Sequence, residues 1–174
     1  MQTKTRTITV TGMLAAIAIV LGVTPLGLIP VPTVAGRATI MHIPAIVGAI
    51  LEGPKVGMLV GFIFGLTSFI TTGSPLIKNP IIAIVPRILI GLFSYWGYKW
   101  TKSPVVAAII GSLTNTIGVM GLAVVFGLTP AAAAIGVVLT QGIPEAIVGA
   151  IITAVVVRPL KKIHGIDGKV SSSR

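Results

Sequence analysis

The sequence predicts an all-α membrane protein, a bundle of six transmembrane helices with both termini in the cytoplasm. Of its 174 residues, 54% are hydrophobic and 9% are charged, and the mean hydropathy is +1.05. Soluble domains carry about 25% charged residues, so this composition lies outside that class. No stretch is polar enough to form a second, soluble domain. We therefore expect one membrane domain over 1–174, embedded in a lipid bilayer.

A transmembrane helix needs about 20 mostly apolar residues, and six segments approach that length. They run over 7–22, 39–51, 56–72, 81–98, 104–126 and 131–157. The second segment rises only about 20 Å as a helix, so it is short or extends into the preceding loop. That loop is rich in Pro and Gly, which favours a loop or a partly re-entrant segment over a helix.

The composition of the two ends of the chain predicts a helix at the start and a flexible tail at the end. The first 22 residues resemble a signal peptide, but no convincing cleavage site follows, so we expect a retained first helix. The tail over about 163–174 is polar and basic, and we expect it to be flexible.

The distribution of Lys and Arg predicts the orientation. One set of segment ends carries Lys4, Arg6, Lys55, Lys99, Lys102, Arg158, Lys161 and Lys162, whereas the other carries Arg37 and Lys78. The richer side faces the cytoplasm under the positive-inside rule, which leaves the two long loops outside. Basic residues scattered in this way record topology, and we expect no nucleic-acid partner.

Small residues recur at a spacing of four in several segments. Such residues let helices approach closely in a membrane. The stripes are Gly57, Gly61 and Gly65; Ala146, Ala150 and Ala154; and, in the first segment, Gly12 and Ala16, then Ala18 and Gly22. Internal packing explains any one of them, but the first helix could instead present its stripe to a partner helix.

Polar side chains within the apolar segments are candidates for a binding site, because burying them in a bilayer is costly. The topology brings them to the outer half of the bundle: Arg87, Asn79, Asn115, Gln141, His42 and Glu145. Gly142 and Pro144 should weaken the last helix beside Gln141 and free backbone groups to face a cavity. A guanidinium suits a carboxylate or phosphate, so we expect an anionic or strongly polar small ligand.

Structural roles compete for these residues. Arg87 and Glu145 could form an ion pair, with Asn115 and Gln141 as interhelical hydrogen-bond partners. His42 could be a satisfied core histidine. Asn79 could simply cap the helix that begins beside it.

Catalysis has little support in the sequence. The acidic residues are Glu52, Glu145 and Asp167, which make no catalytic carboxylate pair, and the chain has no cysteine for a thiolate metal site. No Gly-rich phosphate loop with its lysine is present, so the chain does not hydrolyse ATP itself. We expect no enzymatic activity, no cofactor and no metal.

Three stretches carry a family resemblance: TIMHIPAIVGAILEGPKVGMLVGFIFGLTSFI, KNPIIAIVPRILIGLFSYWGYK and GSLTNTIGV. With them, the chain resembles the substrate-binding S components of energy-coupling factor (ECF) transporters, which are prokaryotic vitamin-uptake systems. The resemblance covers nearly the whole chain. The MHIP, GPKVG and NPIIAIVPRILIG segments place it nearest the pantothenate-type S components.

The resemblance implies a six-helix protein of the prokaryotic cell membrane that binds a vitamin beneath outward loops. It also implies a transmembrane coupling protein and two ABC-type ATPases as partners, and release of the vitamin by toppling of the whole subunit. The docking face of the first helix then maps onto Gly12, Ala16, Ala18 and Gly22, which only approximate the family's Ala-based motif.

Pantothenate carries a carboxylate, two hydroxyls and an amide, which suit Arg87, Asn79, Asn115 and Gln141. A pyridoxine or hydroxymethylpyrimidine ligand is an alternative, as is a structural or regulatory membrane protein without a ligand.

Overall fold

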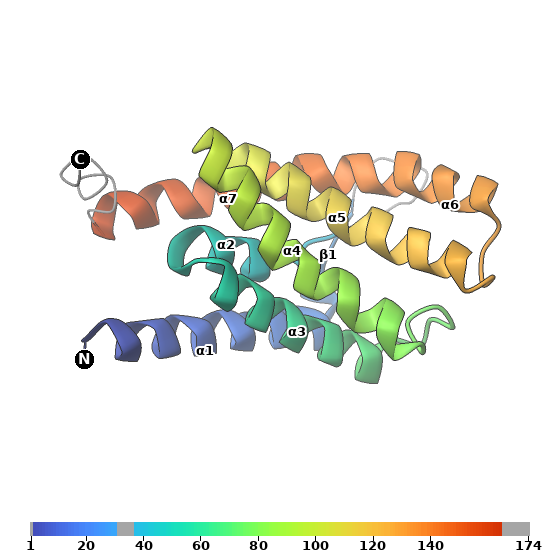
Figure 1. Cartoon of the computed structure of the whole chain (residues 1–174), viewed down its shortest axis with the longest axis horizontal. Coiled ribbons are helices and arrows are strands. Elements are labelled where there is room, and N and C mark those ends of the chain that lie inside the picture. Colours follow the sequence, from blue (N-terminus) through green and yellow to red (C-terminus); the bar gives the residue numbers. More distant parts are fainter. Residues whose placement is uncertain (1, 31–36, 165–174) are drawn as a thin grey trace.

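The computed structural model describes residues 2–30 and 37–164, which form an elongated helical bundle (Figure 1). The helices are α1 (Gln2–Val23), α2 (Ile43–Glu52), α3 (Pro54–Thr71), α4 (Pro80–Thr101), α5 (Pro104–Val125), α6 (Ala131–Val137) and α7 (Ile143–His164). A π-helical turn, η2 (Val138–Gly142), joins α6 and α7 into one rod. The start of α1 and the end of α7 lie at the same end of the bundle, which we call the terminal end (Figure 1). The opposite end is the loop end.

Five helical segments are long and apolar enough to cross a membrane: Thr5–Val23, Pro54–Thr71, Pro80–Thr101, Pro104–Val125 and Ala131–Lys162. The remaining predicted segment, the second along the chain, forms α2, which has only 10 residues and rises about 15 Å. The six predicted helical segments are therefore confirmed, but the second is a partial span. The side of the membrane that each end faces stays a prediction, and the tail predicted to be flexible lies, from 165 onward, outside the described residues.

Local chemistry explains where the helices begin. Proline opens α3, α4 and α5, where its missing N–H would have no intrahelical partner anyway. Asn79 and Ser103 precede α4 and α5 and accept hydrogen bonds from backbone N–H groups of the first turn. At the other end of α4, Lys102 adopts a left-handed conformation (φ 55°), and its N–H closes the helix on Tyr98.

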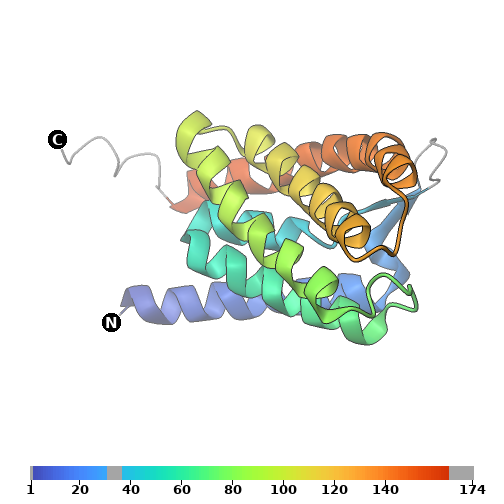
Figure 2. The same ribbon diagram turned by 45° about the vertical axis from the view of Figure 1, so that its right-hand side comes forward.

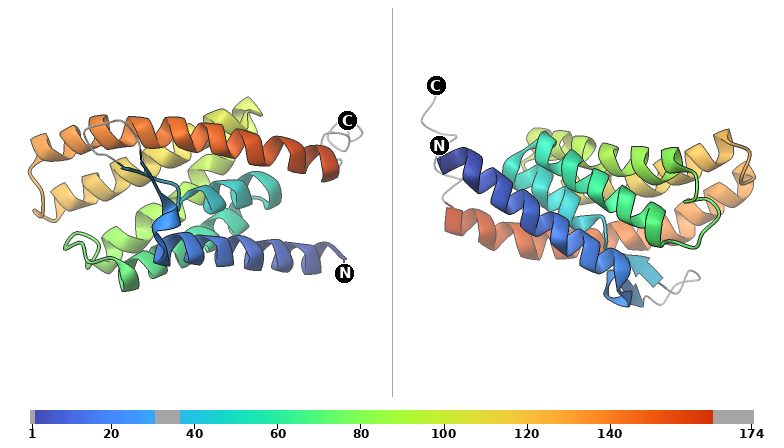
Figure 3. Two further views of the ribbon diagram at one scale, coloured as in Figure 1. Left: turned by 180° about the vertical axis from the view of Figure 1, so that it is seen from behind. Right: turned by 90° about the horizontal axis from the view of Figure 1, so that it is seen from below.

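The loop after α1 contains structure that the sequence did not predict. A 3-10 turn, η1 (Pro25–Gly27), leads into β1 (Leu28–Pro30), which pairs antiparallel with β2 (Arg37–Thr39). Viewed from behind, this hairpin lies across the gap between α1 and the α6–α7 rod (Figure 3, left). Strands of only three residues, one of which ends at Pro30, have no sequence signature strong enough to predict them.

The terminal half of the bundle is tightly packed around α2. Ile46, Val60 and Ile90 are fully buried there, on α2, α3 and α4. A methyl group added to Gly57 would lie 3.0 Å from the Cα of Gly91, so α3 and α4 approach closely along a glycine seam. The internal-packing interpretation of the glycine stripe in α3 is therefore confirmed. Figure 2 shows α4 crossing in front of α2 and α3.

Candidate functional site

The loop half of the bundle is hollow because α2 does not extend into it. A cavity of about 390 Å³ occupies this space, within the ~300–1,000 Å³ range of small-molecule sites. Its walls come from the hairpin, α3, α4, α5 and the α6–α7 rod. The lining residues are Leu28, Thr39, Met41, Phe64, Ser68, Thr72, Ile77, Arg87, Asn115, Thr116, Val119, Met120, Val137, Gln141 and Glu145.

Arg87 is held in the cavity wall by a consequence of the preceding proline. Pro86 lies inside α4 and has no N–H to bond the carbonyl of Ile82 one turn earlier. Nη1 of Arg87 donates to that carbonyl at 2.7 Å. The guanidinium carbon also lies 5.6 Å from the ring centroid of Phe64, a cation–π distance. The side chain is buried, yet its Nε has no hydrogen-bond partner among the described residues.

Glu145, near the start of α7, fastens the hairpin to the helices. Its Oε1 accepts hydrogen bonds from the N–H of Thr39 at 3.0 Å and from the hydroxyl of the same residue at 2.6 Å. Thr116 on α5 donates to Oε2 at 3.2 Å, and Gln141 donates to Oε1 at 3.4 Å. Glu145 is only 3% exposed, so water contributes little to the stabilisation of its charge. Hydrogen bonds from β2, α5 and η2 stabilise it instead.

The direct ion pair considered between Arg87 and Glu145 is absent from the described residues. Arg87 bonds to its own helix, whereas Glu145 bonds to Thr39, Thr116 and Gln141. Both side chains line the same cavity. The cavity therefore presents one cation and one anion that are held separately.

The π-helical turn confirms that the last helix is irregular beside Gln141, whereas the exposure of freed backbone groups to the cavity stays a prediction. It ends at Gly142, two residues before Pro144, and it contains Gln141. Gly142 packs against α5, where an added methyl group would lie 3.3 Å from the side chain of Thr116. Opposite, Asn115 is buried on α5, and its Oδ1 has no partner among the described residues.

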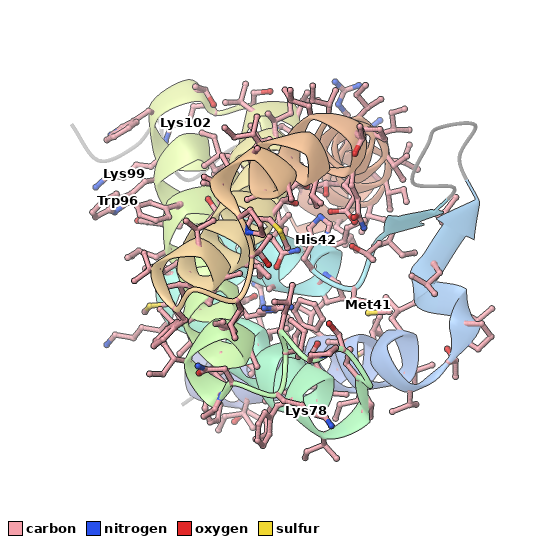
Figure 4. All side chains as sticks on the ribbon, turned by 90° about the vertical axis from the view of Figure 1, so that its right-hand side faces the viewer. Met41, His42, Lys78, Trp96, Lys99 and Lys102 are labelled. Atoms are coloured by element: carbon pink, nitrogen blue, oxygen red, sulfur yellow. The ribbon has the colours of Figure 1, made fainter. Side chains whose placement is uncertain are left out.

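Two of the six predicted binding residues lie outside the cavity lining. His42 is fully buried near the centre of the bundle, at the N-cap of α2, with Nε2 2.7 Å from the hydroxyl of Ser112 (Figure 4). Asn79 caps α4 by accepting from the N–H of Ile81 at 3.0 Å. Arg87, Asn115, Gln141 and Glu145 do line the cavity, and their binding roles stay predictions.

Several lining residues had no signal in the sequence. The hydroxyls of Thr39, Thr116, Ser68 and Thr72 belong to the cavity, as does the ring of Phe64. In apolar helices, hydroxyl side chains commonly bond to their own backbone one turn earlier. Thr67 and Thr114 do so here. The sequence therefore does not reveal whether a threonine lines the cavity or bonds to the backbone of its own helix.

The small residues of α1 fall into two groups. Ala18 is fully buried, and a methyl group on Gly22 would lie 2.9 Å from Cγ2 of Thr67 on α3. Gly12 and Ala16 are exposed, and nothing lies within 4 Å of the position of a methyl group on Gly12. Only Gly12 and Ala16 thus remain open to a partner.

The match to a known family decides the class of this membrane protein. The family model described as the substrate-specific component of ECF transporters matches residues 6–157. The chain belongs to this family. Substrate-specific components of ECF transporters take part in transport and are not a class of enzymes, and this one is a multi-pass protein of the cell membrane.

Two curated relatives support the same assignment of this substrate-specific component. The chain is 30% identical over 154 residues to the pantothenic acid transporter PanT of Lactococcus lactis subsp. cremoris. This match covers 72% of the chain and 79% of the relative. The chain is also 30% identical over 142 residues to the pantothenate transporter PanT of Leuconostoc mesenteroides subsp. mesenteroides, a match that covers 70% of each chain.

Proposed function

We propose that this substrate-specific component captures pantothenate in the cavity of the loop half and delivers it across the membrane with a coupling protein and two ATPases. The observation that carries the proposal is the guanidinium of Arg87, which is buried, lines the cavity and has an unbonded Nε. An unpaired charge in the membrane costs about 2.5 kcal/mol or more. An anionic ligand would offset that cost. Both relatives are named for pantothenate.

The remaining polar groups suit the rest of pantothenate. Its hydroxyls and amide N–H need acceptors, and the free Oδ1 of Asn115 is one. Glu145 already receives hydrogen bonds from Thr39, Thr116 and Gln141, so its charge is compensated without the ligand. The ligand carboxylate is therefore expected on the Arg87 side of the cavity, and the hydroxyls on the side of Asn115. As the charge distribution predicts, the loop end would face outward.

The first experiment compares pantothenate with pantothenol, in which a neutral alcohol replaces the carboxylate. Isothermal titration of the purified protein should show that pantothenol binds at least about tenfold more weakly. Arg87→Lys loses the planar fork that holds a carboxylate through two hydrogen bonds. This variant should bind pantothenate at least about tenfold more weakly than the unmodified protein, and it should discriminate less between the two ligands.

Lys78→Gln is the matched control, because Lys78 is a cation at the same end of the bundle that does not line the cavity. It should leave both affinities unchanged. Unchanged pantothenate affinity in Arg87→Lys would refute the role of the guanidinium. Tighter binding of pyridoxine or hydroxymethylpyrimidine than of pantothenate would reassign the substrate while leaving the family intact.

The docking surface for the coupling protein is proposed on the exposed face of α1. Gly12 and Ala16 lie on it, and α1 lies at the edge of the bundle (Figure 3, right). Small residues there permit close approach of a partner helix. Ala16→Trp should retain pantothenate binding but abolish uptake by the assembled transporter, whereas Ile17→Trp on the flank of the same helix should have little effect. Full uptake by Ala16→Trp would exclude this face as the docking surface.

A further inference from the structure

A second cavity lies at the terminal end of the bundle, far along the helices from the proposed pantothenate site. Its volume is about 530 Å³, and it opens between the end of α4, the start of α5 and the last turns of α7. We call it the basic cleft, because Lys102, Arg158, Lys161 and Lys162 line it. No carboxylate is among the residues that the structure places in its lining.

The backbone adds to the positive potential of the cleft. Ser103 and Pro104, which begin the 22-residue helix α5, also line it. The N-terminus of a helix carries a partial positive charge, which favours anions even though Pro104 has no N–H and the N–H of Val106 already bonds Ser103. Side chains and helix terminus thus point to the same ligand chemistry, a phosphate or another compact anion.

One wall of the cleft is fixed in place. Lys161 is only 9% exposed, and its Nζ lies 4.0 Å above the centroid of the Tyr98 ring. A cation–π contact at this distance restrains a side chain that would otherwise be mobile in solvent. The cleft is therefore a formed site between α4, α5 and α7 and not a loose group of surface lysines.

The neighbouring aromatic residues indicate the depth of the cleft in the membrane. Trp96 and Trp100 stack on the outside of α4 with ring centroids 6.4 Å apart, and they are 44% and 77% exposed. Trp96 points away from the bundle (Figure 4). Exposed tryptophans are enriched where lipid headgroups begin. Trp100 and Lys102 are two residues apart at the end of α4, so the basic cleft lies at headgroup level.

From these observations we infer that the basic cleft binds the phosphate headgroup of an anionic phospholipid, in the leaflet on the side of the terminal end. Basic pockets between transmembrane helices are suited to such headgroups. The acyl chains would lie on the apolar outer faces of the helices. This site is separate from the proposed pantothenate cavity, and the inference does not depend on the identity of the transported substrate.

The test uses native mass spectrometry of the full-length protein in detergent, titrated with phosphatidylglycerol or phosphatidylcholine of identical acyl chains. The unmodified protein should bind phosphatidylglycerol at least about tenfold more tightly. One basic residue near an anionic lipid contributes about fivefold in affinity, so Arg158→Gln with Lys162→Gln should remove most of this preference. Lys55→Gln with Lys99→Gln is the matched control. It removes the same charge at the same end of the bundle from residues outside the cleft lining, and it should change the preference by less than about twofold.

Two results would overturn the inference: no preference for phosphatidylglycerol, or an equal loss in both pairs of substitutions, which would show general surface attraction. Inorganic phosphate distinguishes a free anion from a lipid. If phosphate alone displaces phosphatidylglycerol with an affinity as high as that of the lipid, the cleft is a free-phosphate site and the lipid assignment is wrong. Thermal unfolding of each variant confirms folding, and Lys162→Gln alone, at an exposed position, serves if the pair is unstable.

Discussion

The terminal half and the loop half of this bundle share α3, α4 and α5, yet the centre of the terminal half is packed and the centre of the loop half is hollow. In the terminal half, α2 fills the centre and buries Ile46, Val60 and Ile90 completely. In the loop half, α2 is absent, and the same three helices surround a cavity of about 390 Å³. The difference shows that one short helix is enough to leave a cavity at the centre of a bundle whose other spans are long.

The two halves also differ in their buried polar groups that lack hydrogen-bond partners. The buried guanidinium of Arg87 and the amide of Asn115 both line the cavity, and each has an atom without a partner among the described residues. The contrast is not absolute, because Nδ1 of His42 and the hydroxyls of Ser94 and Thr153 lack hydrogen-bond partners too. Glu52 has an oxygen without a hydrogen bond as well, but that oxygen forms an ion pair with Arg6 at 3.0 Å. Leaving a charged group unpaired costs far more than leaving a hydroxyl unpaired. The buried guanidinium with a free Nε and no ion-pair partner among the described residues thus lies where a ligand could bind it.

The strongest test of this contrast is overpacking in the terminal half. Gly57→Leu places a side chain where a single methyl group already lies 2.9 Å from the Cα of Ala49 and 3.0 Å from the Cα of Gly91. Backbone atoms cannot move aside as a flexible side chain can, so we expect a loss of about 3 kcal/mol in the free energy of unfolding, at the upper end of overpacking costs. Thermal or denaturant unfolding in detergent measures it.

Gly121→Leu on α5 is the control, because nothing lies within 4 Å of a methyl group added at Gly121. Leucine has a helix propensity better than that of glycine by nearly 1 kcal/mol, so this variant should be as stable as the unmodified protein or slightly more stable. If Gly57→Leu were equally harmless, the terminal half would not be tightly packed, and the contrast between the halves would fail.

The smallest effect on stability is expected in the hollow half. Asn115→Ala removes a buried carbonyl oxygen that has no hydrogen-bond partner among the described residues. Removing an unsatisfied group offsets the lost packing, so the free energy of unfolding without ligand should change by less than about 1 kcal/mol. Stabilisation by added pantothenate should fall, because the ligand loses an acceptor. A large loss of stability without ligand would instead assign Asn115 to packing between helices.

The positions of most helices could be predicted from local sequence. Six apolar segments placed most helix ends to within four residues, although α1 begins five residues earlier and α7 ends seven residues later than predicted. Gly142 and Pro144 indicated an irregular turn, which the structure shows as η2. Four of six candidate site residues line the cavity, because a polar side chain in an apolar helix is rarely placed by chance.

Other features had no local signal. The hairpin depends on pairing between Leu28 and Thr39, which lie on either side of a Pro/Gly-rich stretch. The sequence therefore could not show that Thr39 reaches Glu145, 106 residues away in the chain. The four small residues of α1 look equivalent in the sequence, but Gly22 is half-buried against α3 and Gly12 is exposed.

The sequence by itself determined that this chain is a helical membrane protein of the ECF substrate-specific family, because hydropathy, helix boundaries and family motifs are properties of short segments. Only the tertiary structure decided which polar residues share the cavity, which small residues face outward, and that Arg87 bonds to the carbonyl freed by Pro86 and not to Glu145. These outcomes depend on the length of α2 and on the angles at which α3, α4, α5 and α7 pack around its end. Helix packing sets those angles through contacts between distant segments, and no single segment contains that information.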